Sequence, residues 1–471
     1  MTALLLVPMF VGLYMKQKKK LTSSIACNLI LLTGLILRVM YIMYTDVTVR
    51  QHDVHDFFEH NAGHSEYIWY IYSTHSLPDF DPREIFQFYH PPLHHIICAV
   101  WLTAVKALGL PLRTVGVESL QILTAVYSFL FTVFAYKSLK LLDLKPSTVS
   151  YCTAIVAFHP TLIILSGSVN NDMLSSLFGM LAVYYTIKWA RDKKWYSIIM
   201  IALSVGLGMF TKLSVGLLAP AIAVVFLFVF IKSLKEYKRL VPQFLVFGII
   251  CVPIGLFWSV RNYVRFGVPL DYVPQLSENS GQFIDKVPLE RLATWSLYQF
   301  SSPFTQWTWS GAPYDEFNPI IALMKNAMFD EQTFFKRSIT LQSFCTVLFF
   351  LGIVVSLFSA VSLFAMWFKN KNVKLEMKLF MTGLSAAVFG NYINFCLEYP
   401  QVCTENMRYC VPLIFVGAAV VGFFIDRAEE SKNKYYKGSI AVLKKCMVMF
   451  CGFSIFVYTA MMFYTQAYLR A

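Results

Sequence analysis

The segment RQHDVHDFFEHNAGH, residues 50–64, places two aspartates and four histidines within fifteen positions of a largely apolar chain. Asp53 follows closely on a predicted membrane exit, where a carboxylate can act as general base on an acceptor hydroxyl while a phosphate leaves. A solvated loop aspartate is the alternative interpretation. His52 and Asp56 lie beside Asp53 in the sequence, and we predict that they help to bind an acceptor or a sugar.

The histidines around Asp53 raise the question of a metal site, because imidazole is a common ligand of zinc and copper. They are spread over a loop that glycine and proline residues interrupt, whereas a helical pair of ligands has a spacing of four residues. We therefore assign no metal ligands. Two alternatives stay open: histidines that bond lipid headgroups or backbone, and a metal bound by His52, His55 and His60. A divalent cation as cofactor is equally left open.

A second candidate carboxylate lies in SGSVNNDMLSSLF, residues 166–178, where Asp172 begins a predicted helix. The side-chain oxygen of Asn171 or Asp172 is suited to cap the free amides of the first helical turn. The functional alternative is that Asp172 orients an acceptor or a sugar hydroxyl, with Asn171 binding the same group.

Two cations are candidates for binding a phosphate. Lys212, in GLGMFTKLSVGLLAP (206–220), lies at a turn between two apolar segments, and Arg408, in NMRYCVP (406–412), directly precedes another. A lysine at the end of an apolar helix often extends its ammonium group to the membrane surface, which is the alternative interpretation of Lys212. Cations beside a departing phosphate would stabilise its charge.

The elements that must position these residues are membrane helices. The 471 residues are 57% hydrophobic and 14% charged, against roughly 25% charged in soluble domains. Apolar runs of 17 or more residues recur, and each can cross roughly 30 Å of hydrocarbon as a helix. The net charge of +13 comes from clusters at the ends of these runs, which is the positive-inside pattern and not a nucleic-acid surface.

The basic clusters predict an all-α polytopic protein with about 11–13 transmembrane helices. We expect residues 93–110 to form an interfacial helix in an external loop, 45–117, and residues 1–15 to form a partial or tilted helix. The regions are a catalytic membrane module (1–260), an external acceptor or sugar region (261–338) and C-terminal membrane helices (339–471). Eleven spans are expected, at about 21–44, 118–139, 148–167, 173–189, 196–211, 214–231, 241–260, 339–367, 379–397, 409–425 and 443–465.

Four segments carry a resemblance to a known family: RQHDV (50–54), LPDFDPREIFQFYHPPLHH (77–95), AFHPTLIILSGSVNNDML (157–174) and TKLSVGLLAP (211–220). Together and in this order they resemble the polyprenyl-phosphate-sugar-dependent glycosyltransferases of the GT-C superfamily. The similar branches are the protein O-mannosyltransferases and the bacterial aminoarabinose transferase that modifies lipid A. The resemblance covers the first 260 residues in detail and the remainder by layout.

The resemblance implies a membrane enzyme with the GT-C fold, whose first external loop holds a catalytic aspartate, matched by Asp53. It implies roles for His90 and Lys212 in binding the donor phosphate and for Asp172 as a second external carboxylate. The eukaryotic mannosyltransferases have an acidic pair in this loop, whereas Val54 follows Asp53 here. We further expect no soluble C-terminal domain of the kind that some relatives have, and we therefore expect the loops to choose the acceptor.

These observations predict a multi-pass glycosyltransferase of the cell membrane with an extracytoplasmic active site. It would transfer a sugar from a polyprenyl-phosphate carrier to a protein, lipid or cell-envelope glycan, with the bilayer as partner and no nucleic acid. The aromatic run TQWTWSGAPY (305–314) is a candidate to stack on a sugar, and membrane anchoring is its alternative. A solute transporter or permease is the other interpretation of the whole chain.

Overall fold

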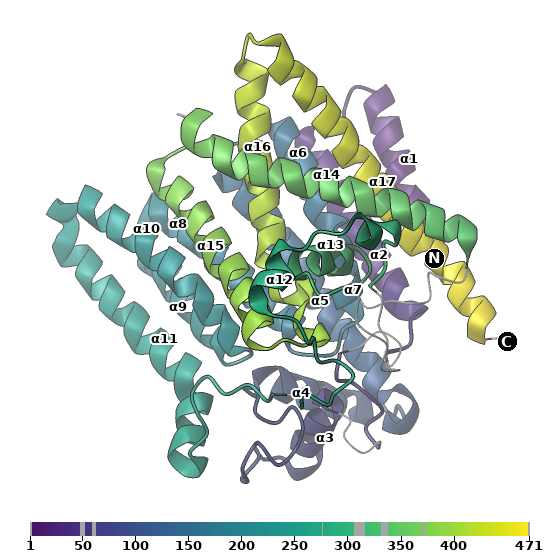
Figure 1. Ribbon diagram of the computed structural model, residues 1–471. Helices are drawn as coiled ribbons and strands as arrows, with labels where there is room; N and C mark the ends of the chain where they lie inside the picture. The colour runs from purple at the N-terminus through teal and green to yellow at the C-terminus, as the bar shows by residue number, and fades with distance from the viewer. Residues whose placement is uncertain are drawn as a thin grey trace. The chain divides into compact units, whose positions relative to one another are not determined.

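The computed structural model describes residues 2–47, 52–58, 63–275, 277–305, 316–330, 338–369 and 373–469 (Figure 1). Within these ranges every regular element is a helix, and β-structure is limited to two isolated bridges, Val54 with Gly63 and Phe283 with Gln401. The predicted all-α class is therefore confirmed. The aromatic run 305–314 lies outside the described residues, apart from Thr305.

Seven helical segments are long and apolar enough to cross a membrane, so the polytopic prediction is confirmed as well. A further pair of helical pieces, which meet at 54°, meets the same criteria together and forms either a broken span or a re-entrant loop. The seven are α2 (Ser23–Met43), α5 (Leu112–Leu141), η3 with α10 (Leu213–Leu218 and Ala219–Lys232), η4 with α11 (Leu234–Glu236 and Tyr237–Phe266), α14 (Ile339–Lys369), α15 (Leu375–Glu398) and α17 (Lys434–Leu469). The bent pair combines α6 (Pro146–Ala157) with α7 (Pro160–Ile164) and η2 (Leu165–Gly167).

The other three expected spans are helical but do not meet the same criteria of length and composition. α9 (Trp195–Met209) has only 15 residues. α8 (Asp172–Asp192) and α16 (Pro412–Glu430) carry charged residues in their last turns, which lower their hydropathy. α1 (Thr2–Gln17) and α4 (Leu93–Ala107) are shorter apolar helices, as expected for a partial and an interfacial helix.

The described chain divides into two compact units that interleave along the sequence. Unit 1 comprises Met1–Met40, Leu142–Ile164 and Gln275–Ala471, and unit 2 comprises Tyr41–Leu141 and Leu165–Pro274. The three regions expected from the sequence are each one continuous stretch of the chain, whereas each unit is made of segments that lie far apart in the sequence. A residue before 142 and one after 164 can therefore share a site within unit 2.

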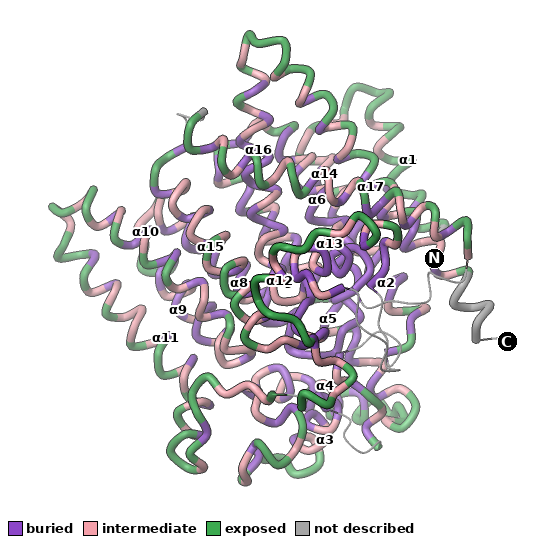
Figure 2. Tube along the Cα trace, viewed as in Figure 1, coloured by how far each residue is buried: buried purple, intermediate pink, exposed green. Residues whose placement is uncertain are grey.

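In unit 2, α8 packs against both α5 and α9, and α9 packs against α11. The helix α3 (His64–Thr74) packs against α4, which in turn contacts α5. Figure 2 shows α8 mostly buried and α11 largely exposed, although α11 is strongly apolar. An apolar helix with such an exposed surface is typical of one that faces lipid.

In unit 1, α14 packs against α16 and α17, and α16 also contacts α6 and α15. Two short helices, α12 (Pro288–Ala293) and α13 (Pro319–Phe329), lie in the stretch between α11 and α14. α13 is mostly buried and packs against α7 and α14. The loop after α15 contains two single-turn helices, η7 (Val402–Thr404) and η8 (Met407–Tyr409).

Candidate active site

The first turn of α8 is fixed by asparagines that precede it. Asn171 occupies the N-cap position, but its side chain makes no capping bond and its Nδ2 instead donates to the Thr211 carbonyl at 3.1 Å. The cap comes from Asn170, whose Oδ1 accepts from the Asp172 amide at 3.1 Å. Asn171 is therefore the N-cap residue, as one of the two expected candidates, but the side-chain bond to the first turn comes from Asn170. The bond from Asn171 ties α8 to the turn that carries Lys212.

Asp172 and Lys212 form an ion pair between their Oδ1 and Nζ atoms. The exposed fractions of the two side chains are only 3% and 16%. The ammonium group is thus held by a carboxylate and does not simply extend towards solvent. Because the opposite charges compensate each other, the buried pair is electrically neutral, and an arriving phosphate would compete with Asp172 for Lys212.

The first turn of α4 lies against both sides of this pair. The Leu93 amide donates to the Phe210 carbonyl at 3.2 Å, just before Lys212. His94 Nε2 donates to the Val169 carbonyl at 3.1 Å, just before the asparagines. Burial lowers the pKa of His94 to about 4, so its ring is neutral and holds one proton, on Nε2.

A cluster of stacked rings joins α4 to α3. His64, the first residue of α3, has its Nδ1 2.9 Å from Nε2 of His95 on α4. The His90 ring stacks on His64 with centroids 5.3 Å apart, and Tyr67 stacks on His95 at 4.1 Å. The predicted phosphate ligand His90 therefore lies in an aromatic cluster at the joint between α3 and α4.

Asp53 lies next to this cluster. Its backbone has a φ of 58°, in the left-handed region, and its carbonyl accepts from the His64 amide at 2.8 Å. The side chain is half-buried, and no hydrogen bond or ion pair joins its carboxylate to another described residue. A partly exposed carboxylate without such a partner retains its acceptor capacity for a substrate.

The other predicted site residues of the first loop, His52 and Asp56, differ in how far their side chains are buried. His52 is almost completely buried. Asp56 is half-buried, and its Oδ1 accepts from the Phe58 amide at 3.4 Å, which closes a short local turn. His60 lies outside the described residues, and no group of three metal-binding side chains occurs in the part of the chain that is described.

Arg408 belongs to unit 1, whereas the other seven predicted site residues all belong to unit 2. Its Nη2 donates to the Tyr409 hydroxyl at 3.0 Å, and its guanidinium lies over the Tyr409 ring. The preceding residue pair, Glu405 and Asn406, is buried. Arg408 therefore lies in a well-packed loop of unit 1.

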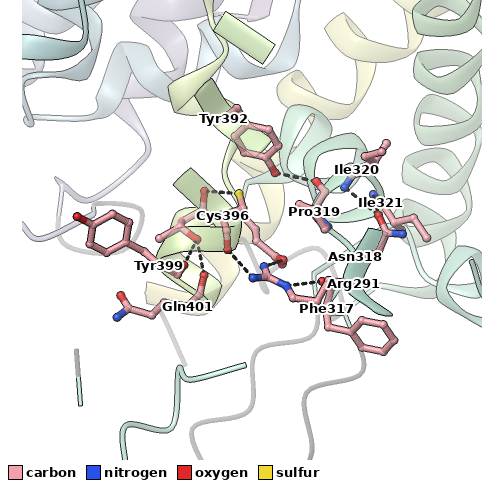
Figure 3. A network of polar contacts seen from close by, with 12 residues as sticks. Arg291, Phe317, Asn318, Pro319, Ile320, Ile321, Tyr392, Cys396, Tyr399 and Gln401 are labelled. Atoms are coloured by element: carbon pink, nitrogen blue, oxygen red, sulfur yellow. Dashed lines mark hydrogen bonds and ion pairs between the residues drawn. The ribbon is translucent and has the colours of Figure 1, made fainter. Parts of the chain in front are cut away.

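A buried polar network in unit 1 was not expected from the sequence (Figure 3). Arg291 donates to the carbonyls of Phe317 and Cys396 and, at 2.6 Å, to Glu405 Oε1. Burial raises the pKa of Glu405 to about 8, although Arg291 opposes this. The side chains of Arg291 and Glu405 are each 1% exposed, so water cannot replace either partner.

A second buried pair lies close in sequence to this network, between Lys325 on α13 and Glu316. Lys325 is the lone charge in the apolar segment IIALMKNAMF. A charged residue within such a segment is a signal for a buried partner, so the sequence did contain this indication. His95 and His64 were also passed over, because their contact depends on the packing of α3 against α4.

Comparison with known proteins supports one family. Residues 90–258 match the family model described as "Dolichyl-phosphate-mannose-protein mannosyltransferase". No curated protein matches the chain. The match confirms that the sequence resembles the polyprenyl-phosphate-sugar-dependent glycosyltransferases over the segment that includes His90, Asp172 and Lys212.

Two solved structures are similar to the chain at a low level. ArnT from Cupriavidus metallidurans bound to undecaprenyl phosphate is 13% identical, with 84% of this chain and 77% of that chain covered and a TM-score of 0.39. The apo state of the same protein is 12% identical, with coverages of 83% and 77% and a TM-score of 0.36. The resemblance to the glycosyltransferases is based on residues 90–258.

Proposed function

From the match of residues 90–258 to the mannosyltransferase family, we propose that this chain transfers a sugar from a polyprenyl-phosphate carrier to an extracytoplasmic acceptor. One observation supports this proposal most directly. The four sequence segments that carry the resemblance contribute to one cluster in unit 2, although they lie as far apart as Asp53 and Lys212. Such convergence is expected of an active site and not of unrelated loop residues.

In the proposed reaction Asp53 is the general base. Its carboxylate accepts the proton of the acceptor hydroxyl, whose oxygen forms a bond to the anomeric carbon of the sugar. The bond from that carbon to the phosphate oxygen breaks, and polyprenyl phosphate leaves with inversion at the carbon. Because Asp53 is partly exposed, it can release the proton to solvent after each turnover.

The leaving phosphate needs positive charge, which we assign to Lys212, with His90 as a further donor of a hydrogen bond. Asp172 would hold Lys212 in place before the donor arrives and orient the acceptor or the sugar. His52, Asp56 and Asn171 would complete the binding of that group. A divalent cation stays an open alternative, and no step above depends on it.

The test uses the full chain in lipid nanodiscs with radiolabelled polyprenyl-phosphate sugars, offered as a panel because the sugar is not specified by the residues. We expect Asp53→Asn to lower the rate by about 10²- to 10⁴-fold, the range for loss of a general base. Glu84→Gln, an exposed acid in the same loop, is the matched control and should retain the rate. An unchanged rate in Asp53→Asn would exclude Asp53 as the base.

A solute transporter is the second candidate, and one observation favours it. The helices in Pro146–Gly167 are bent by 54° at a break, and broken helices commonly line the substrate sites of transporters. His159 lies at the break, where its Nδ1 accepts from the Thr161 amide at 3.3 Å. Uptake of a labelled solute into proteoliposomes, without transfer of any sugar, would favour this candidate.

A further inference from the structure

The backbone of Asp53 is held in an uncommon conformation by the start of α3. Its φ of 58° is in the left-handed region, which few residues other than glycine occupy. Its carbonyl accepts from the His64 amide at 2.8 Å, and Val54 forms a β-bridge with Gly63. That amide is one of the first-turn donors that have no partner within the helix. The orientation of Asp53 therefore depends on where α3 begins.

The start of α3 is in turn held by His95. Nε2 of His95 lies 2.9 Å from Nδ1 of His64, and the two rings stack with centroids 5.2 Å apart. His95 also stacks on Tyr67, one turn further along α3. His64, His95 and Tyr67 are 3%, 0% and 0% exposed. Water cannot replace the hydrogen bond at this site, so loss of His95 would remove the bond that holds the His64 ring to α4.

The protonation of the two rings can be assigned from the burial of His95. Burial, together with His64 and His94, lowers the pKa of His95 far below its usual value, so the ring is neutral. Its Nδ1 is buried and has no hydrogen-bond partner. A buried N–H without a partner is rarer and less favourable than a buried lone pair. We therefore assign the proton to Nε2 of His95, which donates to Nδ1 of His64.

The same turn of α4 contacts the two segments that carry the ion pair. Leu93 bonds the Phe210 carbonyl and His94 bonds the Val169 carbonyl. Those two carbonyls lie two and three residues before Lys212 and Asp172 in the sequence. Through α4, the hydrogen bond from His95 to His64 thus connects the backbone of Asp53 to the position of the Asp172–Lys212 pair.

We propose that His95, acting through His64, is a positioning residue that sets the orientation of Asp53 towards the Asp172–Lys212 pair. This inference rests on the proposed function of Asp53 as base. His95 itself would touch neither donor nor acceptor, because its side chain is fully buried. Its loss should therefore lower kcat, which depends on the placement of the base, more than the KM for the donor.

The decisive variants are His95→Phe and His95→Gln. Phenylalanine keeps the ring on Tyr67 but removes the hydrogen bond, and we expect kcat to fall by about 10- to 100-fold, as for a base displaced by about 1 Å. Glutamine keeps a side-chain N–H of similar reach, so it should fold and should have a kcat between those of His95→Phe and wild type. His75→Asn, at an exposed position with a left-handed backbone at the other end of α3, is the control, because asparagine tolerates that backbone.

A double-variant cycle separates positioning from a general loss of structure. In an Asp53→Glu background the carboxylate is already displaced, so His95→Phe should lower kcat by a much smaller factor than in wild type. An equal factor in both backgrounds, or a wild-type kcat in both His95 variants, would overturn the inference. If Asp53→Asn retains the wild-type rate, the proposed function of Asp53 fails instead, which is a separate outcome.

Discussion

Lys212→Met is the perturbation that tests the buried ion pair most directly. Methionine keeps the length and apolar stem of the side chain but removes the charge that faces Asp172. The carboxylate, 3% exposed, then stays buried without the charge of Lys212, and removal of one partner of a buried pair typically costs about 3–5 kcal/mol. The N-terminus of α8 offsets part of this, by up to about 2 kcal/mol for a partly buried group. We therefore expect a loss of stability of about 1–5 kcal/mol, from the difference of these two effects.

Two further variants separate the loss of a buried charge from the loss of a lysine. Lys193→Met removes the partner of Glu236, a pair whose side chains are 25% and 39% exposed, so it should cost at most about 1 kcal/mol. Asp172→Asn combined with Lys212→Met removes both buried charges. The double variant should regain most of the stability lost in Lys212→Met, because no charge is left uncompensated.

Thermal unfolding of the purified variants in detergent gives the ranking, and sugar transfer measured on the same samples gives the functional effect. We expect unfolding midpoints to fall in the order wild type, Lys193→Met, then Lys212→Met, with the double variant above Lys212→Met. Sugar transfer should stay low in both Lys212 variants, since each lacks the cation for the phosphate. Equal midpoints for Lys193→Met and Lys212→Met would refute the assignment of a buried, mutually dependent pair.

Three other predictions concern single residues. Gly63→Ala should lower stability by about 1–3 kcal/mol and reduce turnover, because its Cβ would lie 2.3 Å from the Asp53 carbonyl oxygen. Gly109→Ala is the control for backbone strain alone, because Gly109 also has a positive φ but no atom lies within 4 Å of the new Cβ. Burial raises the pKa of Glu405 in the folded state to about 8. Its contribution to the free energy of unfolding is therefore present at acid pH and is lost as pH rises from about 4.5 through 8. Glu405→Gln should flatten the dependence of the unfolding midpoint on pH in that window. Burial lowers the pKa of His94 in the folded state to about 4, so stability is lost as pH falls from about 6.5 towards 4. His94→Gln should remove this loss of stability at low pH in the same unfolding measurement.

The fold was predictable where the sequence signal is local. Long apolar runs and basic clusters are properties of single segments, so the all-α polytopic class follows from them. α8 and α16 show the limit of this reasoning, because each is mostly buried against neighbouring helices. Protein neighbours let such helices tolerate charged end turns, so hydropathy alone does not decide whether they span a membrane.

The residues of the candidate site could be selected from the sequence one by one, but their pairing could not. Asp172 and Lys212 were each selected as single charges near helix ends, yet their contact spans forty positions and depends on α8 packing against α9. The cap by Asn170 was missed because adjacent asparagines have the same propensity for the position. His95 gave no signal of its own, since a histidine at the start of an apolar helix has several common roles.

The buried network of unit 1 explains how a short loop can present Arg408 in a defined place. Both bonds that hold the loop join it to α13 and its C-terminal end. Asn326 Nδ2 on α13 donates to the Glu405 carbonyl at 2.6 Å, and Asn406 Nδ2 in the loop donates to Oδ1 of Asp330, the C-cap of α13, at 2.6 Å. Buried charges and amides of this kind contribute little net stability, but they leave few alternative arrangements for the backbone they contact. A similar arrangement occurs within unit 2, where the buried histidines His64 and His95 hold the left-handed backbone of Asp53, the residue that we propose acts as the base.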